Sequence, residues 1–253
     1  MTSSFLVLLP PSETKSDGGN RRLRKKLHWP ELEPVRASVR DDLVALAHGA
    51  PEVARKALKI SPRLAGVELE RNRAVADAPR KPAIERYTGV LYDAIDAATL
   101  SPDARAWVDR HVAIHSALYG LVGAGDAIAA YRLSHDSKLP GAPLKERWRA
   151  HIATALRAHR GPILDLRSKG YVALGPLDGG PERAWGDVKE RLADGSTRSL
   201  NHFNKQSKGL LVRAMAERLA NEQEPVSLET LTSLLHDFAE FEFAAPGVLE
   251  IVR

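Results

Sequence analysis

Three short clusters of polar residues hold the side chains best suited to chemistry, and each follows an apolar run. The clusters are Ser12 to Lys15, Tyr119 with Gly120, and Arg167 to Tyr171. In open α/β sheets, ligands bind at the carboxyl ends of the strands. If the apolar runs are neighbouring strands, the three clusters converge on one edge and form a polar site. The alternative is that they are ordinary polar loops, since polar residues follow strands in every protein.

Five residues are candidates for a catalytic role, although the sequence leaves open whether the protein is an enzyme. They are Glu13, Thr14, Ser168, Tyr171 and Lys205. The hydroxyl groups of Thr14 and Ser168 can hydrogen-bond a ligand, and Tyr171 can stack on it or donate a proton. Glu13 could act as a general base if burial raised its pKa.

A small anionic or nucleobase-like ligand is a further expectation for this site. The residues expected to bind it are Thr14, Lys15, Tyr119, Arg132, Ser168, Lys205, Lys208 and Arg213. Lys205 and Lys208 are three residues apart in a helical pattern, so they project from nearly one face. Lysines near a helix N-terminus oppose the helix dipole, and this small penalty favours a bound anion there. A solvated helix face is the alternative.

The basic residues are concentrated in patches, which suggests nucleic acid as a partner. The chain has 37 Lys+Arg against 32 Asp+Glu, a net charge of +5, and Arg21–Lys26 holds five cations in six positions. Region 56–69 resembles a helix–turn–helix pair, with Ile60-Ser61-Pro62 at the turn. We expect phosphate contacts from Lys56, Lys59, Arg63, Arg71 and Arg73. A solvated basic face is the alternative.

Composition and absent motifs exclude several classes of protein. The chain has no cysteine, so it has no disulfide, no Cys-ligated zinc, no iron–sulfur cluster and no thiol nucleophile. It also lacks the Walker A, G-x-S-x-G and H-E-x-x-H motifs. His111 and His115 would bind a metal only from one helix, and we expect a strand to begin there. No metal or cofactor is therefore expected, although iron or haem bound by residues from across the fold remains open.

The elements that must position these residues indicate a mixed α/β fold (mixed α+β). Three short apolar strands are expected in Phe5–Leu9, Val112–Leu118 and Pro162–Leu166. A hairpin is expected at 184–200 around Asp194-Gly195, followed by closing strands at 238–243 and 248–252. Amphipathic helices are predicted at 39–48, 51–58, 62–75, 89–98, 102–110, 143–159, 204–221 and 227–236.

The predicted organisation is one compact domain over residues 1–253, with a central mixed sheet surrounded by helices. Residues 16–34 are polar and basic, and we expect them to form a mobile excursion. The N-terminus lacks the features of a signal peptide, and no run of apolar residues approaches the length of a membrane span. The expectation is a cytoplasmic protein without a membrane partner.

Several short motifs occur in an order that resembles the YaaA family of bacterial peroxide stress proteins. They are Pro11-x-x-Thr14, Ile60-Ser61-x-x-Leu64-Ala65, Tyr87-Thr88-Gly89, Ser116-x-Leu118-Tyr119-Gly120, Tyr131-Arg132-Leu133, Leu166-x-Ser168-x-x-Tyr171 and Lys205-x-x-Lys208-Gly209-x-x-x-Arg213. Each motif is weak alone, but together they run in register along nearly the whole chain. Glu13 stands where the family has a lysine, with Lys15 two residues later, and Lys169-Gly170 replaces an acidic residue and its neighbour. We interpret these departures as the mark of a divergent, actinobacterial branch.

The resemblance implies a cytoplasmic role in the response to peroxide, limiting damage from peroxide and free iron. It also implies a mixed α/β fold, and DNA binding has been proposed for the family. We therefore favour binding of DNA through the basic patches. The alternative is an enzyme or binder that acts on a nucleobase, a nucleotide or another phosphorylated small molecule in the polar pocket. Because the chain has no cysteine, protection cannot come from thiol oxidation.

Overall fold

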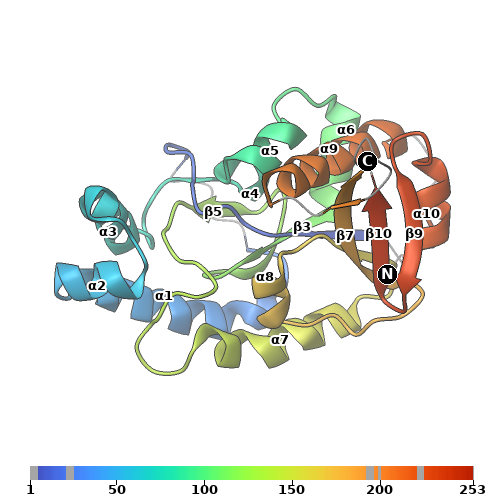
Figure 1. Cartoon of the computed structure of the whole chain (residues 1–253). Coiled ribbons are helices and arrows are strands. Elements are labelled where there is room, and N and C mark those ends of the chain that lie inside the picture. The colour runs from blue at the N-terminus through green and yellow to red at the C-terminus, as the bar shows by residue number, and fades with distance from the viewer. Residues whose placement is uncertain (1–4, 21–25, 192–196, 199–200, 221–224, 253) are drawn as a thin grey trace.

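The computed structural model describes residues 5–20, 26–191, 197–198, 201–220 and 225–252, and only the backbone of residues 201–203. In these ranges the main sheet has eight strands of mixed direction, with helices on both faces (Figure 1). The predicted α/β fold is therefore confirmed. Within the same ranges, no helix combines the length and the hydropathy that crossing a membrane requires.

The centre of the sheet is parallel, which brings the carboxyl ends of its strands to one edge. β1 (Leu6–Leu9) lies between β3 (Val112–Ser116) and β6 (Ile163–Asp165), and it pairs in parallel with both. All four residues of β1 are buried because helices cover both faces of the sheet. The parallel arrangement continues through β7 (Arg183–Arg191) to β10 (Val248–Val252).

Antiparallel strands complete the sheet. The edges of the main sheet are β4 (Gly120–Gly123), beside β3, and β9 (Glu240–Ala245), beside β10. β8 (Thr197–Arg198) pairs with the end of β7. A separate two-stranded sheet joins β2 (Arg80–Pro82) and β5 (Ala127–Ala129).

The helices form two layers around the main sheet, as Figure 1 shows. α1 (Glu33–His48) and α7 (Leu144–Ala158) run along the lower side in that view, and α5 (Val90–Ile95), α6 (Pro102–His111) and α9 (Asn201–Leu219) lie above. The remaining helices are η1 (Pro30–Leu32), α2 (Pro51–Ala57), η2 (Pro62–Leu64), α3 (Ala65–Arg73), α4 (Ala83–Arg86), α8 (Lys169–Ala173) and α10 (Leu228–Leu234). α10 begins at Ser227, whose hydroxyl accepts a hydrogen bond from the backbone N–H of Thr230 at 2.9 Å, as its sequence predicts.

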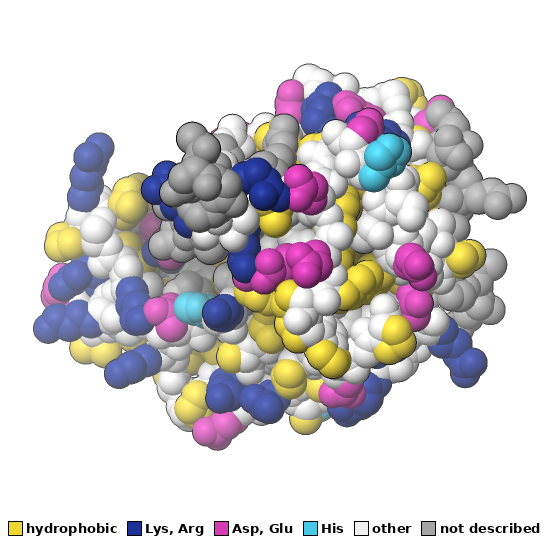
Figure 2. All heavy atoms as spheres, turned by 45° about the vertical axis from the view of Figure 1, so that its right-hand side comes forward, with side chains coloured by type: hydrophobic (Ala, Val, Ile, Leu, Met, Phe, Trp, Pro, Cys, Tyr) yellow, Lys and Arg dark blue, Asp and Glu magenta, His cyan; other side chains and the backbone are white. Residues whose placement is uncertain are grey.

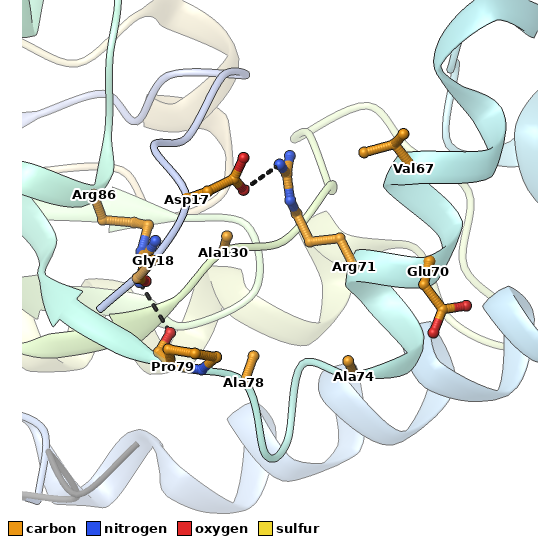
Figure 3. Close-up of a pocket in the computed structure, with 10 residues that line it drawn as sticks. All are labelled: Asp17, Gly18, Val67, Glu70, Arg71, Ala74, Ala78, Pro79, Arg86 and Ala130. Atoms are coloured by element: carbon orange, nitrogen blue, oxygen red, sulfur yellow. Dashed lines mark hydrogen bonds and ion pairs between the residues drawn. The ribbon is translucent and has the colours of Figure 1, made fainter. Parts of the chain in front are cut away.

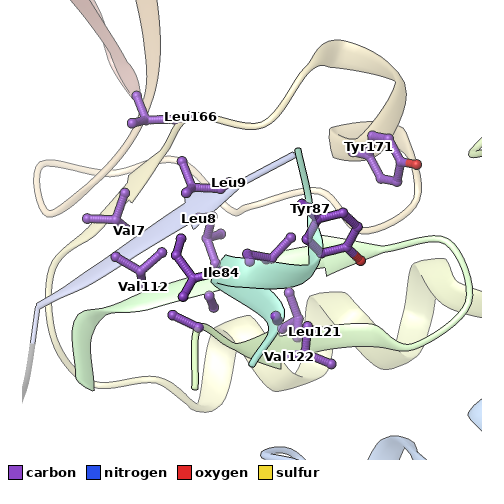
Figure 4. Packing of buried hydrophobic residues seen from close by; sticks show 14 of the residues in the cluster. Val7, Leu8, Leu9, Ile84, Tyr87, Val112, Leu121, Val122, Leu166 and Tyr171 are labelled. Atoms are coloured by element: carbon purple, nitrogen blue, oxygen red, sulfur yellow. The ribbon is translucent and has the colours of Figure 1, made fainter. Parts of the chain in front are cut away.

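The hydrophobic core joins both ends of the chain around β1. Figure 4 shows Val7, Leu8 and Leu9 packed against side chains that include Val112, Leu121 and Leu166. Trp107 and Trp148 belong to this core, at 1% and 0% exposure. Phe243 lies in β9 at the edge of the sheet and is 48% exposed.

Some boundaries differ from those that periodicity predicts. α1 begins at Glu33 rather than at residue 39, because Pro34 suits the first turn of a helix. The helix expected over 62–75 is divided into η2 and α3. The predicted hairpin turn at Asp194-Gly195 lies outside the described residues, although β7 and β8 do pair antiparallel. Residues 21–25 of the basic run also lie outside them.

Candidate functional site

A cavity with a volume of about 960 Å³ opens at the carboxyl edge of the parallel strands. Cavities of this size hold small-molecule ligands. The residues that follow β1 and β6 meet here because the two strands are parallel neighbours. The lining is Pro10–Glu13, Thr88–Tyr92, Leu133–Asp136, Ser168–Tyr171, Trp185, Asp187, Asn204, Lys205 and Lys208.

Most of the candidate catalytic residues are brought together at this cavity. Glu13, Ser168, Tyr171 and Lys205 line it. Thr14 is exposed and is not part of the lining, but its Oγ1 accepts a hydrogen bond at 3.0 Å from the hydroxyl of Thr88, which is. The first and third polar clusters therefore converge on one cavity, as predicted.

Three of the expected ligand-binding residues line the cavity, and Arg132 is hydrogen-bonded to a residue of its wall. Ser168, Lys205 and Lys208 contribute directly. Arg132 donates a hydrogen bond to the Glu13 carboxylate at 2.7 Å and is itself only 14% exposed. Glu13 is 68% exposed, so it lacks the burial that its predicted role as a general base requires.

Lys15, Tyr119 and Arg213 do not line the cavity. Lys15 is buried, with its Nζ 3.0 Å from the Glu13 carbonyl oxygen and 4.2 Å from the centre of the Tyr131 ring. Tyr119 packs edge-on against Tyr131, at 5.5 Å between ring centres. Arg213 lies two helical turns beyond the cavity, where it donates to the carbonyl oxygen of Ile95 and fastens α9 to the end of α5.

Trp185 is the main residue of the cavity that sequence reasoning missed. It is partly buried, and its indole N–H donates to the carbonyl oxygen of Arg167 at 2.9 Å. The ammonium groups of Lys169 and Lys208 lie 5.6 and 5.9 Å from its ring centre, within the range of cation–π attraction. Asp187, two residues later, lines the same cavity. The period of two along a strand is the signal that could have placed both on one face.

The residue that accepts the hydrogen bond from Trp185, Arg167, forms a buried ion pair with Asp165. The Arg167 guanidinium donates to both oxygens of Asp165, at 2.8 and 2.6 Å, and all of these side chains are at most 1% exposed. The same guanidinium donates to His115 Nδ1 at 2.8 Å. Because arginine can only donate, His115 Nδ1 accepts and the ring is neutral. Burial, reinforced by Arg167, accordingly lowers the pKa of His115 well below its usual value.

A glycine permits a close contact on the opposite wall. The His135 ring stacks on Tyr171 at 5.2 Å between ring centres. A Cβ atom on Gly170 would lie only 1.8 Å from His135 Nε2, so this position excludes any larger residue while the ring is there. Gly170 is one of the positions at which the chain departs from the family pattern. The close contact with the His135 ring explains why this position holds a glycine.

Asp136 connects the cavity to the pair formed by α2 and α3. Its carboxylate forms a short ion pair with Lys59, and this hydrogen bond lowers the pKa of Asp136 to about 2. Lys59 lies in the turn after α2 and adopts a left-handed conformation with φ of 55°. The turn of the helix pair therefore stands beside the rim of the cavity.

The candidate phosphate-binding residues divide into two groups. Lys56 and Arg63 are exposed, and Lys59 is half-exposed beside them. Arg71 and Arg73 instead form ion pairs, with Asp17 and Glu68 and with Glu70. Figure 3 shows Arg71 directed at Asp17 beside a second cavity of about 260 Å³. These neutralised side chains do not offer the free charge that was expected of them.

In Figure 2, many Lys and Arg side chains lie over the left part of the visible face, with Asp and Glu among them. His111 ends α6 and His115 lies in β3, so the two do not share a helix. In the described ranges, no three His, Asp or Glu side chains gather as they would around a metal ion.

The buried Lys15 predicts that stability increases with pH. Burial, with repulsion from Arg132, lowers its pKa from 10.5 to about 7, although Glu68 and Glu13 raise it. Between pH 7 and 10 the unfolded chain therefore binds more protons than the folded chain. The free energy of unfolding should rise across this window, by at most about 5 kcal/mol, and this gain is absent below pH 7.

Urea unfolding at pH 7, 8 and 9, followed by circular dichroism, measures this effect. Lys15→Met should flatten the dependence on pH, whereas Lys56→Met, which replaces an exposed lysine, should leave it unchanged. The same slope in the native protein and in Lys15→Met would show that Lys15 is not the cause.

Comparison with known proteins gives a consistent set of relatives. The model of a family described as peroxide stress protein YaaA matches residues 5–245. A UPF0246 protein of Corynebacterium efficiens is 44% identical over 219 residues, covering 84% of this chain and 85% of the relative. A UPF0246 protein of Streptomyces coelicolor is 40% identical over 250 residues, covering 96% and 94%.

Proposed function

Because the chain belongs to the family of peroxide stress protein YaaA, we propose that it binds nucleic acid and so limits the damage that peroxide and iron cause. The proposed ligand is a strand with an unpaired nucleotide. The relatives in Corynebacterium and Streptomyces place the chain in an actinobacterial branch of the family, as its departures from the family motifs predict.

The observation that carries this proposal is the combination of an aromatic ring and cations in one cavity beside a basic turn. Trp185 offers a flat face for a base, and Lys169, Lys205 and Lys208 offer positive charge. Single-stranded nucleic acids are bound in this way, by stacking on aromatic side chains in a positively charged groove. An unpaired nucleotide is small enough for a cavity of about 960 Å³.

The backbone on either side of that nucleotide needs a second surface, which the helix pair can supply. Lys56 and Arg63 are exposed on either side of the turn, and Lys59 connects the turn to the cavity rim through Asp136. Contacts of Lys and Arg with phosphates position a strand without reading its sequence. We therefore expect little preference for base sequence.

Fluorescence anisotropy with labelled single-stranded DNA tests the proposal. Binding should weaken steeply between about 50 and 200 mM salt, as phosphate contacts require. The double variant Lys56→Ala/Arg63→Ala removes two such contacts and should reduce the log–log salt slope by about 1.4, at about 0.7 for each phosphate of a single strand. A duplex with one bulged nucleotide should bind more tightly than the fully paired duplex.

The matched control is Lys145→Ala/Arg149→Ala, which removes two exposed cations from α7, outside both the cavity and the helix pair. Its salt slope should equal that of the native protein. Equal slopes in the two double variants, or no binding at about 50 mM salt, would overturn the proposal. Nicking of plasmid DNA by ferrous iron and peroxide should also fall when native protein is present, and fall less with Lys56→Ala/Arg63→Ala.

The alternative function, binding of a free nucleotide or another phosphorylated small molecule, uses the same cavity. A mononucleotide that occupied Trp185 and Lys205 alone would quench tryptophan fluorescence without needing Lys56 or Arg63. Titration of both double variants with a nucleoside monophosphate separates the two functions. Tight binding of the mononucleotide with no binding of the strand favours the alternative.

A further inference from the structure

We propose that Lys208 is a nucleophilic amine, which forms an imine with the aldehyde of an abasic nucleotide held in the cavity. This inference rests on the proposed function, because nucleic-acid binding is what would bring such an aldehyde to the cavity. It goes beyond that function by assigning a covalent reaction to one side chain and an aldehyde to the substrate.

The position of Lys208 is the first argument. The side chain is only 5% exposed, yet it lines the cavity. Within the described part of the chain, its ammonium group forms no hydrogen bond and no ion pair. Buried charges in proteins are normally paired. By contrast, the ammonium group of Lys189, in β7, donates to Glu250 at 2.5 Å.

The surrounding carboxylates are the second argument. The charge of Asp165 acts on Lys208, but both carboxylate oxygens of Asp165 already accept hydrogen bonds from Arg167. Asp187 lines the cavity near Lys208 without forming an ion pair with it. Both carboxylates favour the ammonium, yet burial outweighs them and lowers the pKa of Lys208 from 10.5 to about 8. Lys208 is then a neutral amine in about a quarter of the molecules at pH 7.5, compared with about 0.1% for an ordinary lysine.

Imine formation requires this neutral amine and an open space in front of it. The amine nitrogen attacks the carbonyl carbon, so that a C–N bond forms and the carbonyl π bond breaks to give a carbinolamine. The two protons of the amine pass to the carbonyl oxygen, which leaves as water when the C=N bond forms. Activation of lysine by desolvation is the usual basis of this chemistry. No oxidant, reductant or metal takes part.

The chemistry of the cavity favours an abasic nucleotide as the source of the aldehyde. Loss of a base leaves an aldehyde at C1′ of the deoxyribose, and oxidative damage to DNA is one cause of such loss. The space left by the missing base admits Lys208 toward C1′, while Trp185 can stack on a neighbouring base. Lys169 and Lys205 are exposed at the mouth, where the flanking phosphates would lie.

Reductive trapping tests this proposal directly. The native protein is incubated with a labelled single-stranded oligonucleotide that carries one abasic site, and sodium cyanoborohydride then reduces any imine to a stable amine. A covalent adduct should appear on a denaturing gel, and mass spectrometry of its peptides should place it on Lys208. The yield should rise with pH, with a midpoint near pH 8.

Two variants make the result specific. Lys208→Met keeps the apolar stem and should reduce the yield at least 20-fold, while circular dichroism and urea unfolding show that it remains folded. Lys145→Met replaces an exposed lysine of α7 and should retain the full yield. An adduct that maps to other lysines, or an equal yield from Lys208→Met, would overturn the proposal.

The remaining outcomes separate this inference from the function on which it rests. Binding of the abasic oligonucleotide by anisotropy without any adduct overturns the imine and leaves nucleic-acid binding intact. No binding to any nucleic acid, with Lys208 trapped by free deoxyribose 5-phosphate, overturns the proposed function and assigns the aldehyde to a sugar phosphate. Trapping by neither substrate overturns the inference.

Discussion

Asp165→Asn is expected to lower the free energy of unfolding by about 3–5 kcal/mol, because it leaves the buried Arg167 guanidinium without its counter-charge. Asp165 accepts three hydrogen bonds from Arg167, two from the guanidinium and one from the backbone N–H at 3.0 Å. An asparagine would turn its NH₂ group toward the guanidinium NH₂, so two donors would face each other. Urea unfolding followed by circular dichroism measures the loss.

The variant should also alter the cavity, because the carbonyl oxygen of Arg167 holds the indole of Trp185. Trp107 and Trp148 are buried far from solvent, so quenching by iodide or acrylamide reports mainly on the partly buried tryptophans. We expect stronger quenching in Asp165→Asn than in the native protein. Replacement of both partners, as Asp165→Leu/Arg167→Met, should recover part of the stability, since two apolar side chains leave no unpaired charge.

Glu240→Gln is the matched control for this experiment. Glu240 forms an ion pair with Arg191 at the surface, where the two side chains are 72% and 45% exposed. An exposed pair contributes about 0–1 kcal/mol, so its loss should hardly change the unfolding midpoint. If Asp165→Asn costs no more than Glu240→Gln, the buried pair is not the support that the structure indicates.

Gly209→Ala is expected to be the most damaging small substitution in α9, with a loss of about 2–3 kcal/mol in the free energy of unfolding. A Cβ atom at this position would lie 2.2 Å from the carbonyl oxygen of Leu91 and 2.8 Å from the Cβ of Ala94. Backbone atoms cannot move aside as a flexible side chain can. The clash therefore outweighs the gain of about 1 kcal/mol that alanine brings to a helix interior.

Gly209 also determines how closely α9 approaches α5, and Lys208 is its neighbour. A helix displaced by the new methyl group would carry Lys208 with it. The yield of the trapped adduct should therefore fall in Gly209→Ala even where the protein remains folded. Urea unfolding and the trapping assay, carried out on the same preparation, measure both effects.

Gly66→Ala serves as the control because Gly66 is also helical, in α3, but a Cβ there would meet nothing within 4 Å. This variant should raise the free energy of unfolding, by up to about 1 kcal/mol. If Gly66→Ala and Gly209→Ala lower the free energy of unfolding equally, the contact with Leu91 is not the cause of the loss at Gly209.

Patterns that depend on neighbours in the chain predicted much of the fold. The apolar runs at residues 5–9, 112–118 and 162–166 contain β1, β3 and β6. Ser101-Pro102 and Ser227 mark the starts of α6 and α10, where each serine caps its helix. These signals are readable because burial on both faces and capping are satisfied by residues close in sequence.

The same reasoning placed Ser168 and Tyr171 at the site, since residues after parallel strands share an edge, and helical spacing near a helix N-terminus added Lys205 and Lys208. It failed for Arg213, where the helical spacing from Lys205 is correct but the side chain bonds to the carbonyl oxygen at Ile95. It also failed for Trp185, because only the pairing of β7 with β6 places this ring beside Arg167. Both errors concern contacts with segments distant in the chain.

By itself, the sequence determined the α/β class, the family, the edge of the sheet that carries the polar clusters, and the absence of thiol chemistry. Only the tertiary structure decided which cations are free and which are neutralised. Arg71 is paired with Asp17, 54 residues away, whereas Lys208 is buried without an ionic partner among the described residues. The reason is physical: the charge state and reactivity of a side chain depend on its desolvation and on the groups within a few ångströms, and folding brings those groups together from distant parts of the chain.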